Sequence, residues 1–290
     1  MMWYILFGLL ILIVAGMVFL HIPYSPTSAQ FQQVVAQNTK IAAPKAQFSE
    51  EDIKNLPLPV QRYFQHCGYL GKPKMLYMKA AMQDVDFVMS KKRTIKIDYT
   101  QLNLVERPER YALISSSLFG IPFEGLDSYA NGTGSMKGVL AKGIRLFDQR
   151  GEKMNRACLA TWLAECLMVP HAALQDFVQW EAIDATRAKA TICWQGISAS
   201  GVFCFAENGE LLEFYTDDRA AIDMQGKETK ARWSALFLDY HMVNGLLQPQ
   251  VIQSIWHYTE GDLVYFNENR VPIHIQYQIK RHDYGYSGAQ

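Results

Sequence analysis

The chain has 290 residues, of which 49% are hydrophobic, and its 28 basic and 28 acidic side chains leave no formal net charge at pH 7. This balance gives no electrostatic reason to expect binding to nucleic acid or to an anionic lipid surface, since both attract proteins with an excess of Lys and Arg. The length suits one large domain or two small ones, and no repeat or composition break divides the chain after residue 45, so we expect a single domain.

The chain begins with an apolar segment. Met1 to Leu20 is uninterrupted by charge, and the first Lys, Arg, Asp or Glu is Lys40. About 20 apolar residues at a rise of 1.5 Å match the ~30 Å hydrocarbon core of a bilayer. We therefore predict an uncleaved, single-pass membrane anchor over residues 1–22 and a polar linker over residues 23–47.

A cleaved signal peptide is the alternative for this segment. Thr27-Ser28-Ala29 offers small residues for cleavage, but a basic n-region is missing and the apolar run is long for a signal. Lys40 and Lys45 lie too far from the run for positive charge to decide its orientation. Because a segment that resembles a signal usually directs export of the downstream chain, we expect an extracytoplasmic domain.

The pattern of cysteines slightly favours a domain that is not exported, because exported domains more often use their cysteines in disulfides. The cysteines of this chain form an odd set without a CxxC pair, which is typical of buried thiols and not of a disulfide framework. The set comprises Cys67, Cys158, Cys166, Cys193 and Cys204.

Short helices are expected at the start of the domain. Ser49 to Asp52 has the pattern of a capping box with an acidic first turn, which predicts a helix start. Pro57 and Pro59 interrupt this helix, and a second helical turn is expected from Val60 to His66.

Alternating apolar residues then predict half-buried strands, at residues 94–99 and, less strictly, at 136–147. Gly132 to Gly138 is glycine-rich, but it fits neither phosphate-loop spacing and leads into a strand pattern, so we interpret it as a tight turn. Gly196 to Gly201 has its glycines one position too far apart for a nucleophile elbow, and we interpret it as a hairpin connection.

One later segment has helical spacing. Leu159, Trp162, Leu163 and Leu167 predict a helix from Glu152 to Val169 that packs on a sheet. After it come short segments rich in β-branched and aromatic residues, which predict strands at 178–183, 188–194, 201–206, 211–215, 229–238, 253–259 and 273–279.

These elements predict an α+β fold. Asn208-Gly209 and Asn244-Gly245 are typical of type I′ hairpin turns, so the strands after the helix should form an antiparallel meander. We expect a single β-rich domain over residues 48–282, built as a curved, mainly antiparallel sheet with one or two packed helices, and a tail over 283–290.

Candidate site residues are few. Asp217, Asp218 and Asp223 are the first choice for a hard cation, but they lack EF-hand spacing, and an exposed polar loop with a local ion pair is the favoured interpretation. The histidines are scattered without zinc-binding spacing, and no catalytic residue can be assigned. We expect no cofactor.

Four tryptophans on the expected strands are candidates for lining a ligand cavity. A curved sheet can use such rings either to fill its core or to surround an apolar ligand, and both interpretations remain open. The four are Trp180, Trp194, Trp233 and Trp256.

Several blocks of the sequence resemble DUF6544 (formerly DUF6920), a family of uncharacterised bacterial proteins. The likeness begins with Leu56-Pro57-Leu58-Pro59-Val60-Gln61-Arg62-Tyr63-Phe64 and covers roughly residues 48–279. The other blocks are Gly71-Lys72-Pro73, Phe119 to Phe123, Asp127-Ser128-Tyr129, Gly132 to Gly138, Leu163-Ala164-Glu165, Val169-Pro170, Gln179-Trp180-Glu181, Ala188 to Thr191, Trp233 and Asp239-Tyr240. The chain departs from the family pattern at Asn244 to Pro249.

The resemblance implies a membrane-tethered bacterial protein and supplies no activity, substrate or catalytic residue. By analogy of fold alone, a helix against a curved antiparallel sheet is similar to the half-barrel of the LolA and LolB lipoprotein carriers. The leading hypothesis is therefore a non-enzymatic, membrane-anchored domain that binds a lipid or another apolar ligand at the cell envelope. The alternatives are a hydrolase whose site is assembled only in the fold, and an envelope scaffold without a ligand.

Overall fold

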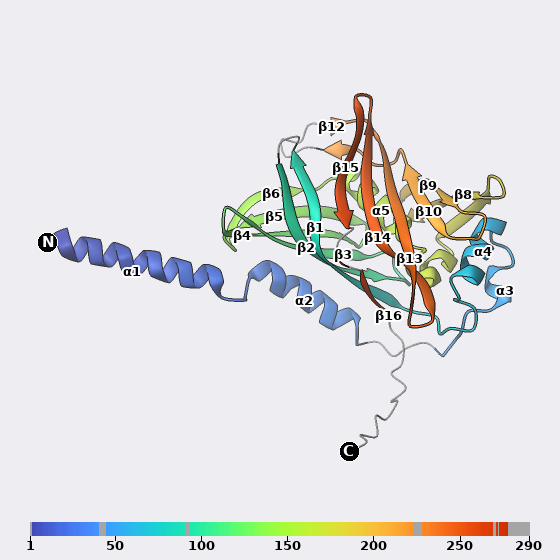
Figure 1. Ribbon diagram of the computed structural model, residues 1–290, viewed down its shortest axis with the longest axis horizontal. Helices are drawn as coiled ribbons and strands as arrows, with labels where there is room; N and C mark the ends of the chain where they lie inside the picture. The colour runs from blue at the N-terminus through green and yellow to red at the C-terminus, as the bar shows by residue number, and fades with distance from the viewer. Residues whose placement is uncertain are drawn as a thin grey trace, which may run out of the picture.

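The apolar N-terminal segment forms one exposed helix. The structure, a computed structural model, describes residues 2–40, 45–90, 93–222, 228–268, 271 and 273–277. Helix α1 (Met2–His21) projects from the domain, and none of its residues is buried (Figure 1). Its length and hydropathy allow it to cross a membrane or to serve as a signal sequence.

A second helix lies in the segment expected to be a linker. Helix α2 (Pro26–Asn38) begins at Ser25, whose hydroxyl accepts a hydrogen bond from the backbone of Ser28, and Pro26 occupies the first helical position. Phe31 is buried, and it packs with Val35 against the outer face of the sheet. The segment therefore contains a packed helix in addition to polar connections.

Two short helices lie at the start of the domain as the sequence predicts, but the second begins two residues before the expected Val60 and contains Pro59 in its first turn. Helix α3 (Glu50–Ile53) has its capping box between Ser49 and Asp52, and α4 (Leu58–His66) starts directly after Pro57. Both lie at the end of the domain farthest from α1 (Figure 1).

The first half of the sheet is a simple antiparallel meander. Each strand pairs with the next one along the chain, so local hairpins account for the pairings among these six strands. The strands are β1 (Tyr77–Ser90), β2 (Arg93–Leu104), β3 (Arg110–Leu118), β4 (Ile121–Ala130), β5 (Thr133–Leu140) and β6 (Ile144–Gln149).

Helix α5 (Glu152–Ala164) then crosses the sheet from one edge towards the other. It contacts β4 and β5 on one side and β8, β9 and β10 on the other. It ends before the expected Val169, and a 3-10 helix, η1 (Pro170–Leu174), follows. We call the face that α5 covers the inner face of the sheet.

The remaining strands return from the far edge and meet β1 in the middle. The sheet order is β6-β5-β4-β3-β2-β1-β15-β14-β13-β10-β9-β8-β7, with β16 also on β1 and a separate β11-β12 pair. The strands are β7 (Val178–Ala182), β8 (Arg187–Trp194), β9 (Ile197–Phe205), β10 (Leu211–Thr216), β11 (Ala221–Ile222), β12 (Glu228–Thr229), β13 (Arg232–Val243), β14 (Leu246–Tyr258), β15 (Gly261–Glu268) and β16 (His274–Tyr277).

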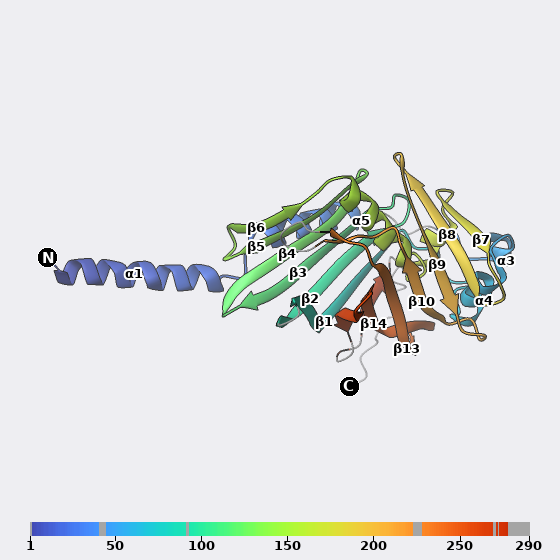
Figure 2. The ribbon, with the colours of Figure 1, turned by 90° about the horizontal axis from the view of Figure 1, so that it is seen from above.

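The expected fold class is confirmed. The sheet is antiparallel and strongly curved, its edges β6 and β7 do not pair with each other, and α5 lies inside the curve (Figure 2). The main core fills the space between the inner face and α5, where Trp162 is fully buried and donates from Nε1 to the Leu104 carbonyl at 3.0 Å.

One of the two expected turns differs from the sequence prediction. Asn244 and Gly245 both have positive φ, at 53° and 76°, as a type I′ turn requires. At Asn208-Gly209 only the glycine does, with φ of 102°, and its N–H bonds to the Ala206 carbonyl. The longer β9–β10 loop places a single residue in the left-handed region, so a two-residue turn is not formed there.

Candidate functional site

Two of the four candidate tryptophans are half-buried and pack against the margin of the main core. Trp180 donates from Nε1 to the Ala173 carbonyl at 2.9 Å, and its ring centre is 5.0 Å from that of Phe203. Trp194 lies 5.1 Å from Phe177. Both indoles are half-buried among neighbours from the β7–β10 end of the sheet.

The other two are buried, with 3% of Trp233 and 8% of Trp256 exposed, and they form a continuous aromatic cluster with their neighbours. Trp233 and Trp256 are directly opposite on β13 and β14. Trp233 Nε1 donates to the Tyr265 hydroxyl at 3.0 Å, Tyr265 stacks on Trp256 at 6.0 Å, and Phe87 lies 6.1 Å from Tyr265. We call Phe87, Trp233, Trp256 and Tyr265 the aromatic wall.

A cation lies on the aromatic wall. The guanidinium carbon of Arg219 is 4.1 Å from the Trp233 ring centre and 5.5 Å from that of Trp256. These distances are within the range of cation–π attraction. Arg219 Nε is buried and has no hydrogen-bond partner among the residues that the structure describes.

A buried charge network lies on the inner face of β2, β3 and β4. Arg110 donates from Nε to Glu165 at 2.9 Å and from Nη1 to Asp127 at 2.7 Å, and Nη2 donates to the Tyr99 hydroxyl. Asn103 adds a 2.7 Å bond to Glu165. Burial opposes the charge of Arg110, but Glu165, Tyr99 and Asp127 outweigh it and raise the pKa of this guanidinium, so the network ties α5 to the sheet as a charged group.

Cys158 lies beside this network without the properties of a nucleophile. Its thiol donates to Asp127 at 3.8 Å. Burial, reinforced by the Asp127 carboxylate, raises the pKa of Cys158 well above the usual thiol value. A thiol that stays protonated at neutral pH is a poor nucleophile and a poor metal ligand.

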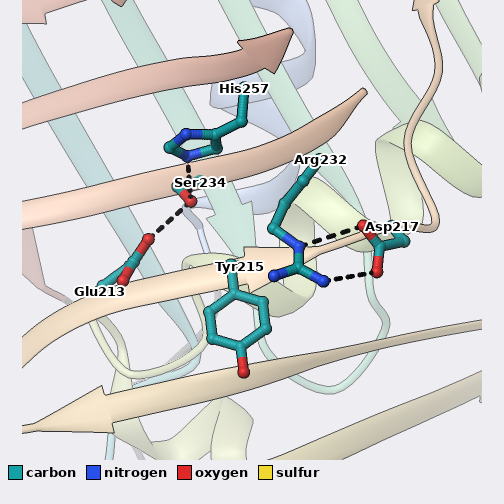
Figure 3. A pocket seen from close by; sticks show the side chains of 6 residues that line it. All are labelled: Glu213, Tyr215, Asp217, Arg232, Ser234 and His257. Atoms are coloured by element: carbon teal, nitrogen blue, oxygen red, sulfur yellow. Dashed lines mark hydrogen bonds and ion pairs between the residues drawn. The ribbon is translucent and has the colours of Figure 1, made fainter. Parts of the chain in front are cut away.

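The outer face carries an open hollow of about 540 Å³ over β10, β13 and β14 (Figure 3). Asp217 accepts two hydrogen bonds from Arg232, at 3.2 and 3.1 Å, and Arg232 lies 4.8 Å from the Tyr215 ring centre. Asp217 and a histidine therefore meet in one hollow, but the Asp217 carboxylate is already engaged by a cation.

A chain of polar side chains crosses this hollow. Ser234 Oγ lies 2.9 Å from His257 Nε2, and His257 Nδ1 lies 2.8 Å from Asp262 Oδ1. This connectivity resembles a serine–histidine–aspartate triad, but Ser234 has no exposed surface and its hydroxyl donates to Glu213 at 2.6 Å. A nucleophile must reach its substrate, so the arrangement fits a structural role better than hydrolysis.

The acidic candidates bond to separate partners. Asp218 accepts from the backbone and hydroxyl of Ser200 at 2.7 and 3.1 Å, whereas Asp217 bonds to Arg232, and Asp223 lies outside the described residues. In the part of the chain that is described, no three His, Cys, Asp or Glu side chains gather as a metal site would require.

Sequence reasoning singled out neither Arg110 nor Arg219 as a site residue. No periodic signal marks either residue, because Arg110 begins a strand and Arg219 precedes one. Their roles depend on residues distant in sequence, Glu165 for Arg110 and the two tryptophans for Arg219.

Comparisons with known proteins identify the domain without assigning an activity. A family model described as a family of unknown function, DUF6544, matches residues 46–268, which confirms the resemblance. Among solved structures, the chain is similar to a LolA superfamily protein from Nitrosomonas europaea, at 9% identity over 73% of this chain and 92% of that chain, with a TM-score of 0.37. A likeness this distant assigns no ligand to this chain. The comparison with curated proteins gave no match.

Proposed function

We propose that this chain, which belongs to DUF6544, a family of unknown function, binds a lipid or another apolar ligand. The ligand lies on the inner face of the curved sheet, and α1 anchors the protein in the cell membrane. The carrying observation is the aromatic wall, with the Arg219 cation lying on it. Trp233 and Trp256 are buried and form the base of the wall, whereas Phe87 and Tyr265 are half-buried and offer apolar contact area. A guanidinium with a free donor can pair with an acidic headgroup.

The apolar lining extends beyond the wall. Met136, Leu140 and Phe147 are only half-buried, although they pack against the main core. Large apolar side chains that stay partly accessible inside a curved sheet provide surface for an acyl chain. Burial of such surface stabilises by about 25 cal/mol per Å².

The test is recovery of a ligand from the full chain. The protein is purified in detergent and extracted with organic solvent, and the extract is examined by mass spectrometry; melting is also followed with added palmitate, because a bound ligand raises Tm. We expect a co-purifying lipid or a rise in Tm, both reduced in Trp256→Leu and retained in Trp194→Leu. Absence of lipid together with an unchanged Tm contradicts the proposal.

A further inference from the structure

The turn between β3 and β4 has an unexpected residue at its tip. Phe119 and Gly120 both have positive φ, at 55° and 79°, the geometry that Asn131-Gly132 and Asn244-Gly245 also adopt. Asn tolerates this region, whereas a bulky apolar residue there is strained. Phe119 is nevertheless 90% exposed, so neither the turn geometry nor burial accounts for it.

Other apolar side chains are exposed at the same end of the sheet. Ile144 is 59% and Leu146 47% exposed at the start of β6, and Ile121 begins β4. The two hairpins are adjacent, because the Ala141 amide donates to the Pro122 carbonyl at 2.8 Å. We call Phe119, Ile121, Ile144 and Leu146 the tip cluster.

The tip cluster lies next to the end of α1. Lys142, in the turn between β5 and β6, donates to the Phe19 carbonyl at 2.7 Å and also to the carbonyl of Ile22. Its ammonium lies 5.3 Å from the Phe19 ring centre. Figures 1 and 2 show the β3–β4 and β5–β6 ends of the sheet close to the domain-proximal end of α1.

A second contact fixes this arrangement from the other side of the junction. The Ser25 hydroxyl, at the start of α2, donates to Glu124 on β4 at 2.6 Å. The α1–α2 junction is therefore held against both hairpins, so a bilayer spanned by α1 would have its surface at the level of their tips. Arg93, 4.5 Å from the Phe119 ring centre, adds a cation at the same level.

We propose that the tip cluster inserts into the interface of the bilayer that α1 spans, so that this end of the sheet rests on lipid. Exposed apolar side chains next to Arg93 suit this interface, since the apolar groups enter the acyl boundary and the guanidinium reaches phosphate groups. The proposal depends on anchoring by α1 and is independent of ligand binding.

The test measures which environment each site meets. The full chain first carries Cys193→Ser and Cys204→Ser, which remove the two least buried thiols. A single NBD fluorophore is then attached at Phe119→Cys, Glu207→Cys or Leu12→Cys. Each labelled protein is placed in phosphatidylcholine nanodiscs. Glu207 is exposed on the β9–β10 loop, at the opposite end of the domain. Doxyl-labelled lipid quenches fluorophores in the bilayer, and iodide quenches those in water.

The expected result is a blue-shifted emission at Phe119→Cys that doxyl lipid quenches and iodide does not, with the reverse at Glu207→Cys. If the label at Leu12→Cys is quenched by doxyl lipid while the label at Phe119→Cys behaves like that at Glu207→Cys, the insertion proposal is wrong and anchoring stands. If doxyl lipid does not quench the label at Leu12→Cys, anchoring itself fails, and the insertion proposal fails with it.

A second variant separates membrane contact from folding. Phe119→Asn places at the tip the residue that two other hairpins use, so the fold should be retained. With the label moved to Ile144→Cys, we expect Phe119→Asn to shift its emission to the red and to increase iodide quenching. An unchanged emission together with unchanged quenching contradicts insertion of the cluster.

Discussion

The guanidinium carbon of Arg219 lies 4.1 Å from the centre of the Trp233 ring, on the inner face of the sheet. Cation–π attraction favours this position by about 0.5 to 2 kcal/mol, while a buried donor without a partner costs about 1 to 3 kcal/mol. Because the two effects are of similar size, Arg219 contributes little net stability to the ligand-free protein. In the proposed complex, the Nε of Arg219, which has no partner among the described residues, would pair with an acidic group of the ligand.

Replacement of Arg219 should therefore affect binding more than stability. We expect Arg219→Met to change the unfolding free energy by less than about 1 kcal/mol and to abolish the rise in Tm with an acidic amphiphile. Arg110→Met is the contrasting variant, because it leaves Glu165 and Asp127 without their cation and should cost about 3 to 5 kcal/mol. Urea unfolding in detergent measures both; similar losses in the two variants would contradict this assignment.

The glycine-rich stretch before α5 serves close packing. A Cβ on Gly134 would lie 2.6 Å from the Met154 carbonyl oxygen and 2.9 Å from Cys158 Sγ, so Gly134→Ala must push α5 away from β5. We expect a loss of about 1 to 3 kcal/mol in unfolding free energy. Gly143→Ala is the matched control, since a Cβ there meets no atom within 4 Å. A neutral Gly134→Ala would show that the helix can shift freely.

Acid should weaken the fold through His171. Its Nδ1 bonds to the Met75 carbonyl at 2.7 Å, and burial lowers the pKa of His171 below its ordinary value of 6.5. As the pH falls through 6.5, the unfolded chain binds a proton at this histidine that the folded protein does not, so the unfolding free energy decreases. Above pH 6.5 the histidine is neutral in both states, and its full contribution to the unfolding free energy is present. We expect His171→Gln to flatten this decline between pH 7 and 5 relative to wild type, as measured by urea unfolding. An equal slope in both proteins would exclude His171 as the cause.

The Ser234 hydroxyl should not react as a nucleophile. It has no exposed surface and bonds to Glu213 and His257, so a fluorophosphonate probe should leave the mass of the native protein unchanged. Ser234→Ala should instead cost about 1 to 3 kcal/mol, because it deprives Glu213 and His257 of a partner. A phosphonylated Ser234 peptide in a tryptic digest would restore the hydrolase hypothesis.

Local patterns were enough to predict part of the aromatic wall. The Asn244-Gly245 turn sets the register of β13 and β14, and each step from it adds one residue to each strand. Trp233 and Trp256 are equally far from this turn, so their pairing follows from the turn alone. Helix α2 also had a sequence signal, Ser25 followed by Pro26, but few apolar residues accompany it.

The rest of the site depends on contacts that no local pattern encodes. Tyr265 joins the wall where the register of β14 and β15 shifts between Ser254 and Ile255. Arg219 contacts the aromatic wall from the connection that follows β10. Arg110 bonds to Glu165, which lies 55 positions later in the sequence. Such partners are chosen by three-dimensional packing, so neither composition nor periodicity indicates them.

The meeting of β1 with β15 in the middle of the sheet sets the order in which the chain can be completed during synthesis. Asp86 pairs with Asn267, so β1 cannot pair with β15 until almost two hundred further residues have left the ribosome. The β1–β6 meander can form from local hairpins meanwhile, with one unpaired edge exposed. The last strands to be translated thus join the two halves of the sheet, because β15 pairs with both β1 and β14. Truncation near residue 260 would leave two half-sheets with unpaired edges.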